Sequence, residues 1–254
     1  MSCVEKPKEG NALTAANGGS TAQLPLGSTE FKKWFGKSKI VDENGNLLIV
    51  FHGTYAVFDS FERGYKDIGI HFGNHEQAIK RIDQLSPYRL VDKSKSKVMP
   101  VYLKMENPLV INDDIGQWHW ISAMQKCIWR EAEINPDDVG LQSLYLRFNE
   151  YQKQRTVEMQ VDIDKWNENN KGKKSDRSDM DWTMEEGYYV VSHEWGDKNA
   201  KDAMKVILSA GYDGIKYLNN SEGDGWSYAV FSPNQIKSIN NKGTWNAESE
   251  NIYQ

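Results

Sequence analysis

The stretch LLIVFHGT, at residues 47–54, is a continuous apolar run rich in β-branched and aromatic residues. The turn-forming sequence DENGN precedes it at residues 42–46. A run of this length after a turn predicts a buried strand. At its end the strand would carry the imidazole of His52, the bare backbone of Gly53 and the hydroxyl of Thr54. Glycine lets a flat ligand approach the main chain, and the two flanking side chains can hydrogen-bond hydroxyl groups of that ligand.

The composition is typical of a globular protein with a substantial core. The chain has 254 residues, of which 39% are hydrophobic and 26% are charged. Its formal net charge of −5 argues against broad, nonspecific attachment to DNA or to an anionic membrane. Cys3 and Cys127 form neither a disulfide framework nor a zinc-binding spacing, which favours a reducing compartment.

No apolar run approaches transmembrane length, and the N-terminus lacks the hydrophobic stretch of a secretory signal. We therefore expect a cytoplasmic location, in the producing cell or in a target cell after delivery, and no membrane partner. Residues 1–27 are polar and glycine-rich and are predicted to be a flexible tail.

Residues 28–254 are predicted to form one α+β domain with a mostly antiparallel sheet. Short strand-like segments lie near both ends of this region, at residues 69–73, 98–105, 109–111, 214–218, 227–231 and 236–239. A helix is predicted to open at Asn74, because Gln77 completes a capping box with it. Regular alternation of strands and helices is missing, so a doubly wound parallel sheet is excluded.

A mainly helical insertion is expected at about residues 113–200. A helix is predicted to begin at Asn135, with Pro136 in its first position, and a strand is predicted at residues 188–192. The polar stretch 152–181 is interpreted as an exposed loop. A contact with nucleic-acid phosphates is the alternative, because basic side chains cluster there between two tryptophans, namely Lys171, Lys173, Lys174 and Arg177 with Trp166 and Trp182.

Four sequence blocks follow one another in an order that resembles the ADP-ribosyltransferase superfamily. They are FHGT at 51–54, GIHFG at 69–73, AGYDGIKYLNNSEG at 210–223 and SYAVFSPNQIKSI at 227–239. The likeness is closest to the transferase domains in polyvalent proteins of phages and mobile elements, and the HGT motif also resembles that of diphtheria toxin and the poly(ADP-ribose) polymerases. The resemblance implies a split antiparallel β-sheet core.

The resemblance also implies roles for individual residues. His52 would bind an NAD ribose, Gly53 would hold the nicotinamide carboxamide through its backbone, and His71 would stand where relatives have a stacking tyrosine. Glu222 is the expected catalytic carboxylate, with Asp224 in reserve; a solvated loop charge is the alternative for Glu222. The remaining implied contacts are those with NAD, by Thr54, Tyr55, Phe72 and Ser227, and those with the target, by Trp226 and Asp224.

The activity implied by the resemblance is that of a toxin-like mono-ADP-ribosyltransferase that uses NAD as co-substrate and no metal. It would cleave the nicotinamide–ribose bond and transfer ADP-ribose to a macromolecular acceptor, with a protein favoured over a nucleic acid. The alternatives are an NAD glycohydrolase and a non-catalytic nucleotide-binding module. An antitoxin or immunity protein is a further expected partner.

Overall fold

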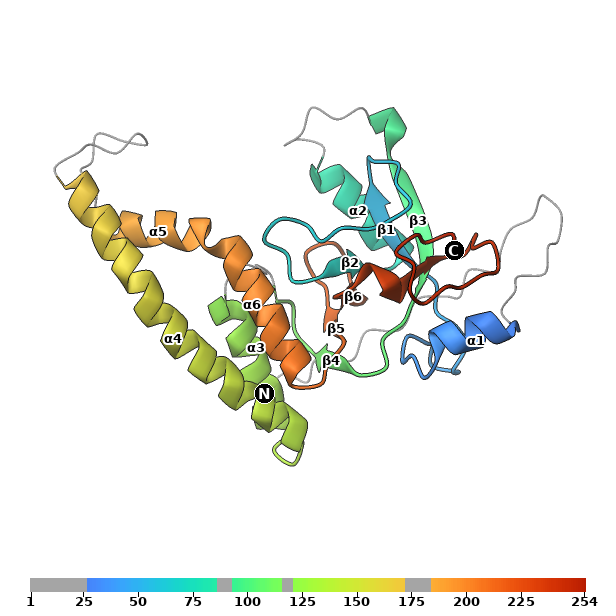
Figure 1. Ribbon diagram of the computed structural model, residues 1–254, viewed down its shortest axis with the longest axis horizontal. Helices are drawn as coiled ribbons and strands as arrows, with labels where there is room; N and C mark the ends of the chain where they lie inside the picture. Colours follow the sequence, from blue (N-terminus) through green and yellow to red (C-terminus); the bar gives the residue numbers. More distant parts are fainter. Residues whose placement is uncertain (1–26, 86–92, 116–120, 172–183) are drawn as a thin grey trace. The chain divides into compact units, whose positions relative to one another are not determined.

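The computed structural model describes residues 27–85, 93–115, 121–171 and 184–254, so the predicted tail lies almost entirely outside the described residues. The internal contacts of the chain divide it into two units. The sheet unit comprises Met1–Arg63, Gly69–Ile115 and Tyr212–Gln254, and the helical unit comprises Gly64–Ile68 and Gly116–Gly211. Figure 1 labels helices α1–α6 and strands β1–β6 of the two units.

The sheet unit contains two small sheets. The first has the strand order β1-β3-β7 and is antiparallel throughout. The second has the order β2-β6-β5-β4, and only its β4–β5 pair is parallel. The strands are β1 (Val50–Thr54), β2 (Ile70–Phe72), β3 (Lys97–Leu103), β4 (Pro108–Ile111), β5 (Gly214–Leu218), β6 (Trp226–Val230) and β7 (Ile236–Ser238). The predicted α+β class with a mostly antiparallel sheet is therefore confirmed.

One apolar cluster joins the two sheets. Val50, Val101 and Ile236 come from the first sheet, and Phe72 and Val230 come from the second. All five side chains are buried, which explains why each strand was recognisable as a short apolar run.

Two α-helices flank these sheets. Helix α1 (Thr29–Phe35) is capped by Ser28, whose hydroxyl oxygen accepts a bond from the Phe31 amide at 3.1 Å. Helix α2 (His75–Leu85) has the predicted capping box, because Asn74 and Gln77 each accept a bond from the other's amide, at 2.9 and 2.8 Å. Helix α2 packs against β1 and so fixes the strand that carries the HGT motif. Short 3-10 turns, η2 (Lys93–Lys95) and η3 (Pro233–Gln235), precede β3 and β7.

The C-terminal segment lies against the loop that follows β1. The buried ammonium group of Lys237 donates to the carbonyl oxygens of Ser249 and Asn251, at 2.8 and 3.0 Å. The amide of Ile252 in turn donates to the carbonyl oxygen of Asp59 at 2.7 Å. These bonds hold the loop that brings Phe61 into the core.

The helical unit contains α3 (Ile121–Ile134), α4 (Val139–Asn170), α5 (Met184–Glu194) and α6 (Gly196–Ser209). None of the helices in the described ranges is long and apolar enough to cross a membrane. The helix predicted from Asn135 begins later, at Val139, because the Asp138 carboxylate accepts a bond from the Leu141 amide and caps it there.

Two predictions in the helical unit are wrong. Residues 188–192 lie in helix α5 and not in a strand, and the expected loop at residues 152–181 is helical as far as Asn170. The physical reason is a buried stripe at intervals of four residues along α4, formed by Arg155, Met159 and Ile163. Val191 of α5 packs on the last two of these residues.

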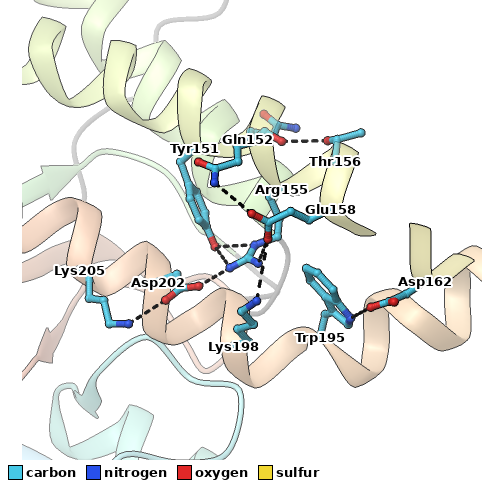
Figure 2. A network of polar contacts seen from close by, with 11 residues as sticks. Tyr151, Gln152, Arg155, Thr156, Glu158, Asp162, Trp195, Lys198, Asp202 and Lys205 are labelled. Carbon is cyan, nitrogen blue, oxygen red and sulfur yellow. Dashed lines mark hydrogen bonds and ion pairs between the residues drawn. The ribbon is translucent and has the colours of Figure 1, made fainter. Parts of the chain in front are cut away.

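The buried stripe could not be recognised from the sequence, because it contains Arg155 and a charged residue usually indicates a solvent-exposed helix face. In the structure its guanidinium group contacts the carboxylates of Glu158 and Asp202 and the hydroxyl of Tyr151, and it lies 4.9 Å from the ring of Trp195. Figure 2 shows this network, which joins α4 to Trp195, the residue between α5 and α6, and to Asp202 of α6. The network replaces the hydration that a buried guanidinium loses.

Candidate functional site

His52 lies in β1 with its ring packed edge-on against Phe61, at a centroid distance of 5.1 Å. Its Nδ1 atom lies 2.8 Å from the carbonyl oxygen of His71. Because a carbonyl oxygen only accepts, Nδ1 carries the proton and the neutral ring keeps Nε2 as an acceptor. Burial lowers the pKa of His52, and the positive charge of Arg81 lowers it further, against the opposing effect of the bond to His71.

The bare α-carbon of Gly53 faces helix α2. A Cβ atom there would collide with the carbonyl oxygen of Ala78 and press on Ile82. A glycine is therefore required at this position because helix α2 packs closely on it. The reason expected from the sequence was a different one, namely the approach of a flat ligand.

The backbone of Gly53 points to the edge of β1 that β3 does not cover. Phe51, two residues earlier, exchanges both backbone bonds with Gly73, at 2.8 and 3.0 Å, and lies opposite Pro100 of β3, which has no N–H. In an antiparallel ladder alternate residues direct their N–H and C=O groups to the same side. Gly53 therefore directs its own pair away from β3, as binding of a carboxamide through the main chain requires.

The hydroxyls that follow Gly53 have partners within the protein. The Thr54 hydroxyl oxygen accepts a bond from the Ala56 amide at 3.0 Å, and the Tyr55 hydroxyl donates to the carbonyl oxygen of Ile82 at 2.6 Å. Tyr55 thus ties the end of β1 to helix α2. The structure gives both residues a structural role beside the NAD contacts that were predicted for them.

His71 and Phe72 are neighbours in β2 and so face opposite sides of the second sheet. Phe72 is only 3% exposed, and its ring lies 5.5 Å from the ring of His52. Its place is in the core behind His52. The His71 ring lies on the other face of the sheet, with Nδ1 3.2 Å from the hydroxyl of Tyr217.

Burial shifts the pKa values of His71 and Tyr217 on this face of the second sheet. Part of His71 is exposed, but its Nε2 atom is shielded from solvent, and burial together with the charges of Arg81 and His52 lowers its pKa to about 3. Burial also raises the pKa of Tyr217. Both His71 and Tyr217 are therefore neutral at physiological pH, and they lie on the same face as Ser227, which pairs with Tyr217 in the ladder.

Glu222 lies in the loop between β5 and β6 and is linked to Ser227. One of its carboxylate oxygens accepts a bond from the side-chain Nδ2 of Asn219 at 2.9 Å, and that same nitrogen donates to the Ser227 hydroxyl at 3.0 Å. Ser227 donates onward to Gln77 of α2 at 3.1 Å. The other oxygen of Glu222 lies 3.4 Å from the Arg81 guanidinium.

These contacts bring the predicted residues from distant parts of the sequence together. His52 bonds the backbone of His71, whose ring contacts Tyr217; Glu222 and Ser227 share Asn219. The charge of Arg81 acts on both imidazoles and also pairs with the carboxylate of Glu222. The carboxylate of Glu222 is thus held by Asn219 and Arg81, and a held carboxylate can stabilise a positive charge that develops on a ligand.

Of the residues predicted to touch the target, Asp224 lies within this loop and Trp226 is the first residue of β6. Asp224 is exposed, and its carbonyl oxygen accepts a bond from the Asn74 side chain at 3.2 Å. Trp226 is half-buried against the core, and the ammonium group of Lys216 lies 4.4 Å from the centre of its ring. In the described parts of the chain, no group of three or more His, Cys, Asp or Glu side chains is placed to hold a metal ion.

Sequence reasoning missed Arg81, Gln77, Asn219 and Tyr217. Gln77 was recognised only as the capping-box partner of Asn74, and no local pattern marked Arg81, whose contact with Glu222 joins segments that are distant in the sequence. The alternative nucleic-acid surface is only partly described, since Lys173, Lys174, Arg177 and Trp182 lie outside the described residues. Trp166 lies in α4 and is partly buried against Met159, Ile163 and Val191.

A comparison with protein families gives one match. The model of the family described as "ADP-Ribosyltransferase in polyvalent proteins" matches residues 42–246, which covers every strand of the sheet unit and the whole helical unit. Neither the curated proteins nor the solved structures give a match.

Proposed function

This chain belongs to the family of ADP-ribosyltransferases in polyvalent proteins, and on that premise we propose that it is an NAD-dependent mono-ADP-ribosyltransferase. The observation that supports the proposal is that His52 bonds the backbone of His71, while Glu222 is linked through Asn219 to Ser227, on the same sheet face as the His71 ring. The coarser conclusion, that the chain is an ADP-ribosyltransferase domain, follows from the family alone.

The proposed reaction begins with cleavage of the bond between nicotinamide and ribose. The electron pair of that bond goes to the pyridinium nitrogen, so neutral nicotinamide leaves and C1′ of the ribose becomes an oxocarbenium-like cation. The carboxylate of Glu222 stabilises this charge. A nucleophile of the acceptor then forms the new bond to C1′ and loses its proton.

The other residues bind and orient NAD. His52 offers Nε2 as an acceptor to a ribose hydroxyl, because its Nδ1 proton is used by the carbonyl of His71. Gly53 offers its N–H and C=O at the strand edge to the carboxamide. His71 remains neutral, so it adds no charge that would repel the developing cation. Correct orientation of the bound dinucleotide contributes to the rate in its own right.

The proposed acceptor is a host protein, so the enzyme would act as a toxin and have an antitoxin or immunity protein as a partner. The exposed Asp224 and the half-buried Trp226 beside Glu222 are the proposed contacts with it. A nucleic-acid acceptor is less favoured, because one of the two tryptophans that suggested base stacking, Trp166, is partly buried in α4.

The substitution Glu222→Gln tests the catalytic assignment. We expect nicotinamide release to fall about 100-fold, as for loss of one charged group at a transition state, while the Kd for NAD stays within about twofold. Release is measured by chromatography and binding by calorimetry. The control is Glu248→Gln, a change at an exposed carboxylate, which is expected to match the wild type. Unchanged turnover in Glu222→Gln would refute the role of this carboxylate.

The acceptor class is tested by incubating the protein with adenylate-labelled NAD and a cell lysate. Label that protease removes and nuclease does not supports a protein acceptor, and the reverse result supports a nucleic acid. Free ADP-ribose without a labelled macromolecule would show an NAD glycohydrolase. Binding of NAD without any release of nicotinamide would show a non-catalytic module.

A further inference from the structure

The loop that carries Glu222 lies along one face of helix α2. The side chains of Asn74, Gln77 and Gln84 donate to the backbone carbonyl oxygens of Asp224, Gly223 and Ser221, at 3.2, 2.9 and 3.0 Å. Between these amides lies the ion pair of Arg81 with Glu222. The helix thus contacts four successive residues of the loop.

The spacing of these residues explains how one helix does this. Gln77, Arg81 and Gln84 are separated by four and three residues, and Asn74 precedes Gln77 by three. At 3.6 residues per turn such positions fall on one stripe of a helix surface. The polar stripe of Asn74, Gln77, Arg81 and Gln84 therefore runs parallel to the loop.

The far side of the loop is held as well. The carboxylate of Asp114 accepts bonds from the Asn220 amide and the Ser221 hydroxyl, at 3.0 and 2.9 Å. The base of the loop is closed by a bond from the Asn219 amide to the carbonyl oxygen of Gly225 at 3.0 Å. Gly223 and Gly225 have φ angles of 123° and 124°, which side chains other than glycine rarely adopt.

Within this frame Arg81 is the group that acts on the carboxylate itself. The three amide side chains of the stripe bind main-chain oxygens, and only Arg81 reaches the side chain of Glu222. The Arg81 side chain is 47% exposed and that of Glu222 is 20% exposed, so the pair lies at the margin of the protein and not in its core. Such a pair contributes little to folding but restricts where the carboxylate lies.

We propose that Arg81 is the positioning residue of Glu222, and that the polar stripe of α2 is the device that sets the catalytic carboxylate in place. This inference rests on the proposed function. Arg81 acts through Glu222: it holds one carboxylate oxygen while Asn219 holds the other, so the group is oriented before the substrate arrives.

The test is a comparison of kcat and KM for nicotinamide release in Arg81→Gln. We expect kcat to fall about 10-fold with KM for NAD within about twofold, because a misplaced carboxylate affects the transition state more than the bound substrate. Arg81→Lys, which retains the charge, is expected to recover most of the loss. The control is Lys104→Gln, which removes a partly exposed cation paired with Glu106 at 3.6 Å elsewhere in the sheet unit.

A double variant separates positioning from direct binding. If Arg81 acts through Glu222, adding Arg81→Gln to Glu222→Gln slows the reaction no further. Additive losses would overturn the inference. So would a rise in KM with kcat unchanged, which would make Arg81 a residue that binds the phosphates of NAD.

Hydrogen exchange of backbone amides tests the role of Arg81 independently of the proposed catalytic activity. The Glu222 amide donates to the side-chain oxygen of Asn219 at 2.9 Å, so its hydrogen exchange reports the order of the loop whether or not the protein cleaves NAD. We expect exchange of the Glu222 amide to accelerate in Arg81→Gln and not in Lys104→Gln, because the Asn219 side chain binds both this amide and the carboxylate that Arg81 holds. Inactive wild-type protein would refute the proposed function, whereas unchanged exchange in Arg81→Gln would refute the inference alone.

Discussion

Gly53 shows how closely helix α2 packs on strand β1. The space that a side chain would need is filled by the backbone carbonyl of Ala78 and by Ile82. Because a backbone atom cannot rotate away, even a methyl group forces the helix to shift.

We therefore expect Gly53→Ala to lower the free energy of unfolding by about 1–3 kcal/mol, the usual cost of overpacking. Urea denaturation followed by circular dichroism measures the change. Gly27→Ala serves as the control, because among the described residues, its chain neighbours apart, no atom lies within 4 Å of a Cβ at Gly27. Equal stability of the two variants would show that α2 yields more readily than its contacts indicate.

His71 makes the stability of the protein depend on pH. Its pKa is about 3 in the folded protein, below the ordinary value of 6.5, so the unfolded chain takes up a proton over a range in which the folded protein does not. The contribution of the neutral ring is complete above pH 6.5 and is lost as the pH falls towards 3. The loss is at most about 1.4 kcal/mol for each pH unit.

The variant His71→Asn keeps a polar atom near Tyr217 and removes the titration. We expect its unfolding free energy to fall less steeply than that of the wild type between pH 6 and 4, as measured by urea denaturation at each pH. Some slope remains, because burial also lowers the pKa of His52.

At the level of single residues, the sequence predicted those that carry a motif. His52, Gly53, His71, Ser227 and Glu222 were singled out; the structure bonds His52 to the backbone of His71 and links Glu222 to Ser227 through Asn219, while their roles towards NAD stay predictions. The supporting residues were missed because their roles depend on contacts between segments. Arg81, for example, meets Glu222 across 141 positions of sequence, and nothing local marks such a partner.

Among the elements, helix α4 depends on a buried charge. The Arg155 side chain is only 7% exposed and joins Glu158 of α4 to Asp202 of α6. Removing the guanidinium leaves two carboxylates and the Tyr151 hydroxyl without the group that they share. Figure 2 shows how these partners converge on Arg155.

Arg155→Met is therefore expected to lower the free energy of unfolding by about 2 kcal/mol, somewhat less than for a fully buried pair because both carboxylates keep some exposure. The control on the same helix is Lys165→Met, which breaks an exposed pair with Asp162 and is expected to change stability by less than about 0.5 kcal/mol. Urea denaturation of both variants tests this. A similar change in the two would show that burial adds nothing to the Arg155 network.

The strands of the sheet unit were predicted correctly, whereas two segments of the helical unit were assigned the wrong secondary structure. Most strands of the sheet unit are short, mainly apolar runs near turn residues, so their local pattern and their buried position agree; β7, which contains Lys237 and Ser238, is the exception. Residues 188–192 have the β-branched and aromatic composition of a strand, but packing of Val191 on Met159 and Ile163 places them in a helix. Tertiary contacts decided these segments, and composition alone could not.

The whole molecule consists of two units of different kinds, and the family match at residues 42–246 spans both. The sheet unit is discontinuous in sequence: Leu109 of β4 pairs with Ile215 of β5, although the helical unit lies between them in the chain. The resemblance on which the sequence reasoning relied comes from blocks before and after this interruption. The candidate site lies entirely in the sheet unit.

The parallel pairing of β4 with β5 has a consequence for how such a protein can be varied. Two parallel neighbours cannot be joined by a tight hairpin, and the chain must travel back the length of a strand, which takes about a dozen residues at least. The fold therefore requires a crossover connection between β4 and β5, but the pairing of these strands does not determine the sequence or structure of that connection. Any insert that returns the chain to Gly214 satisfies the pairing of β4 with β5, so the length and content of the inserted segment can change without altering the strand order of the sheet.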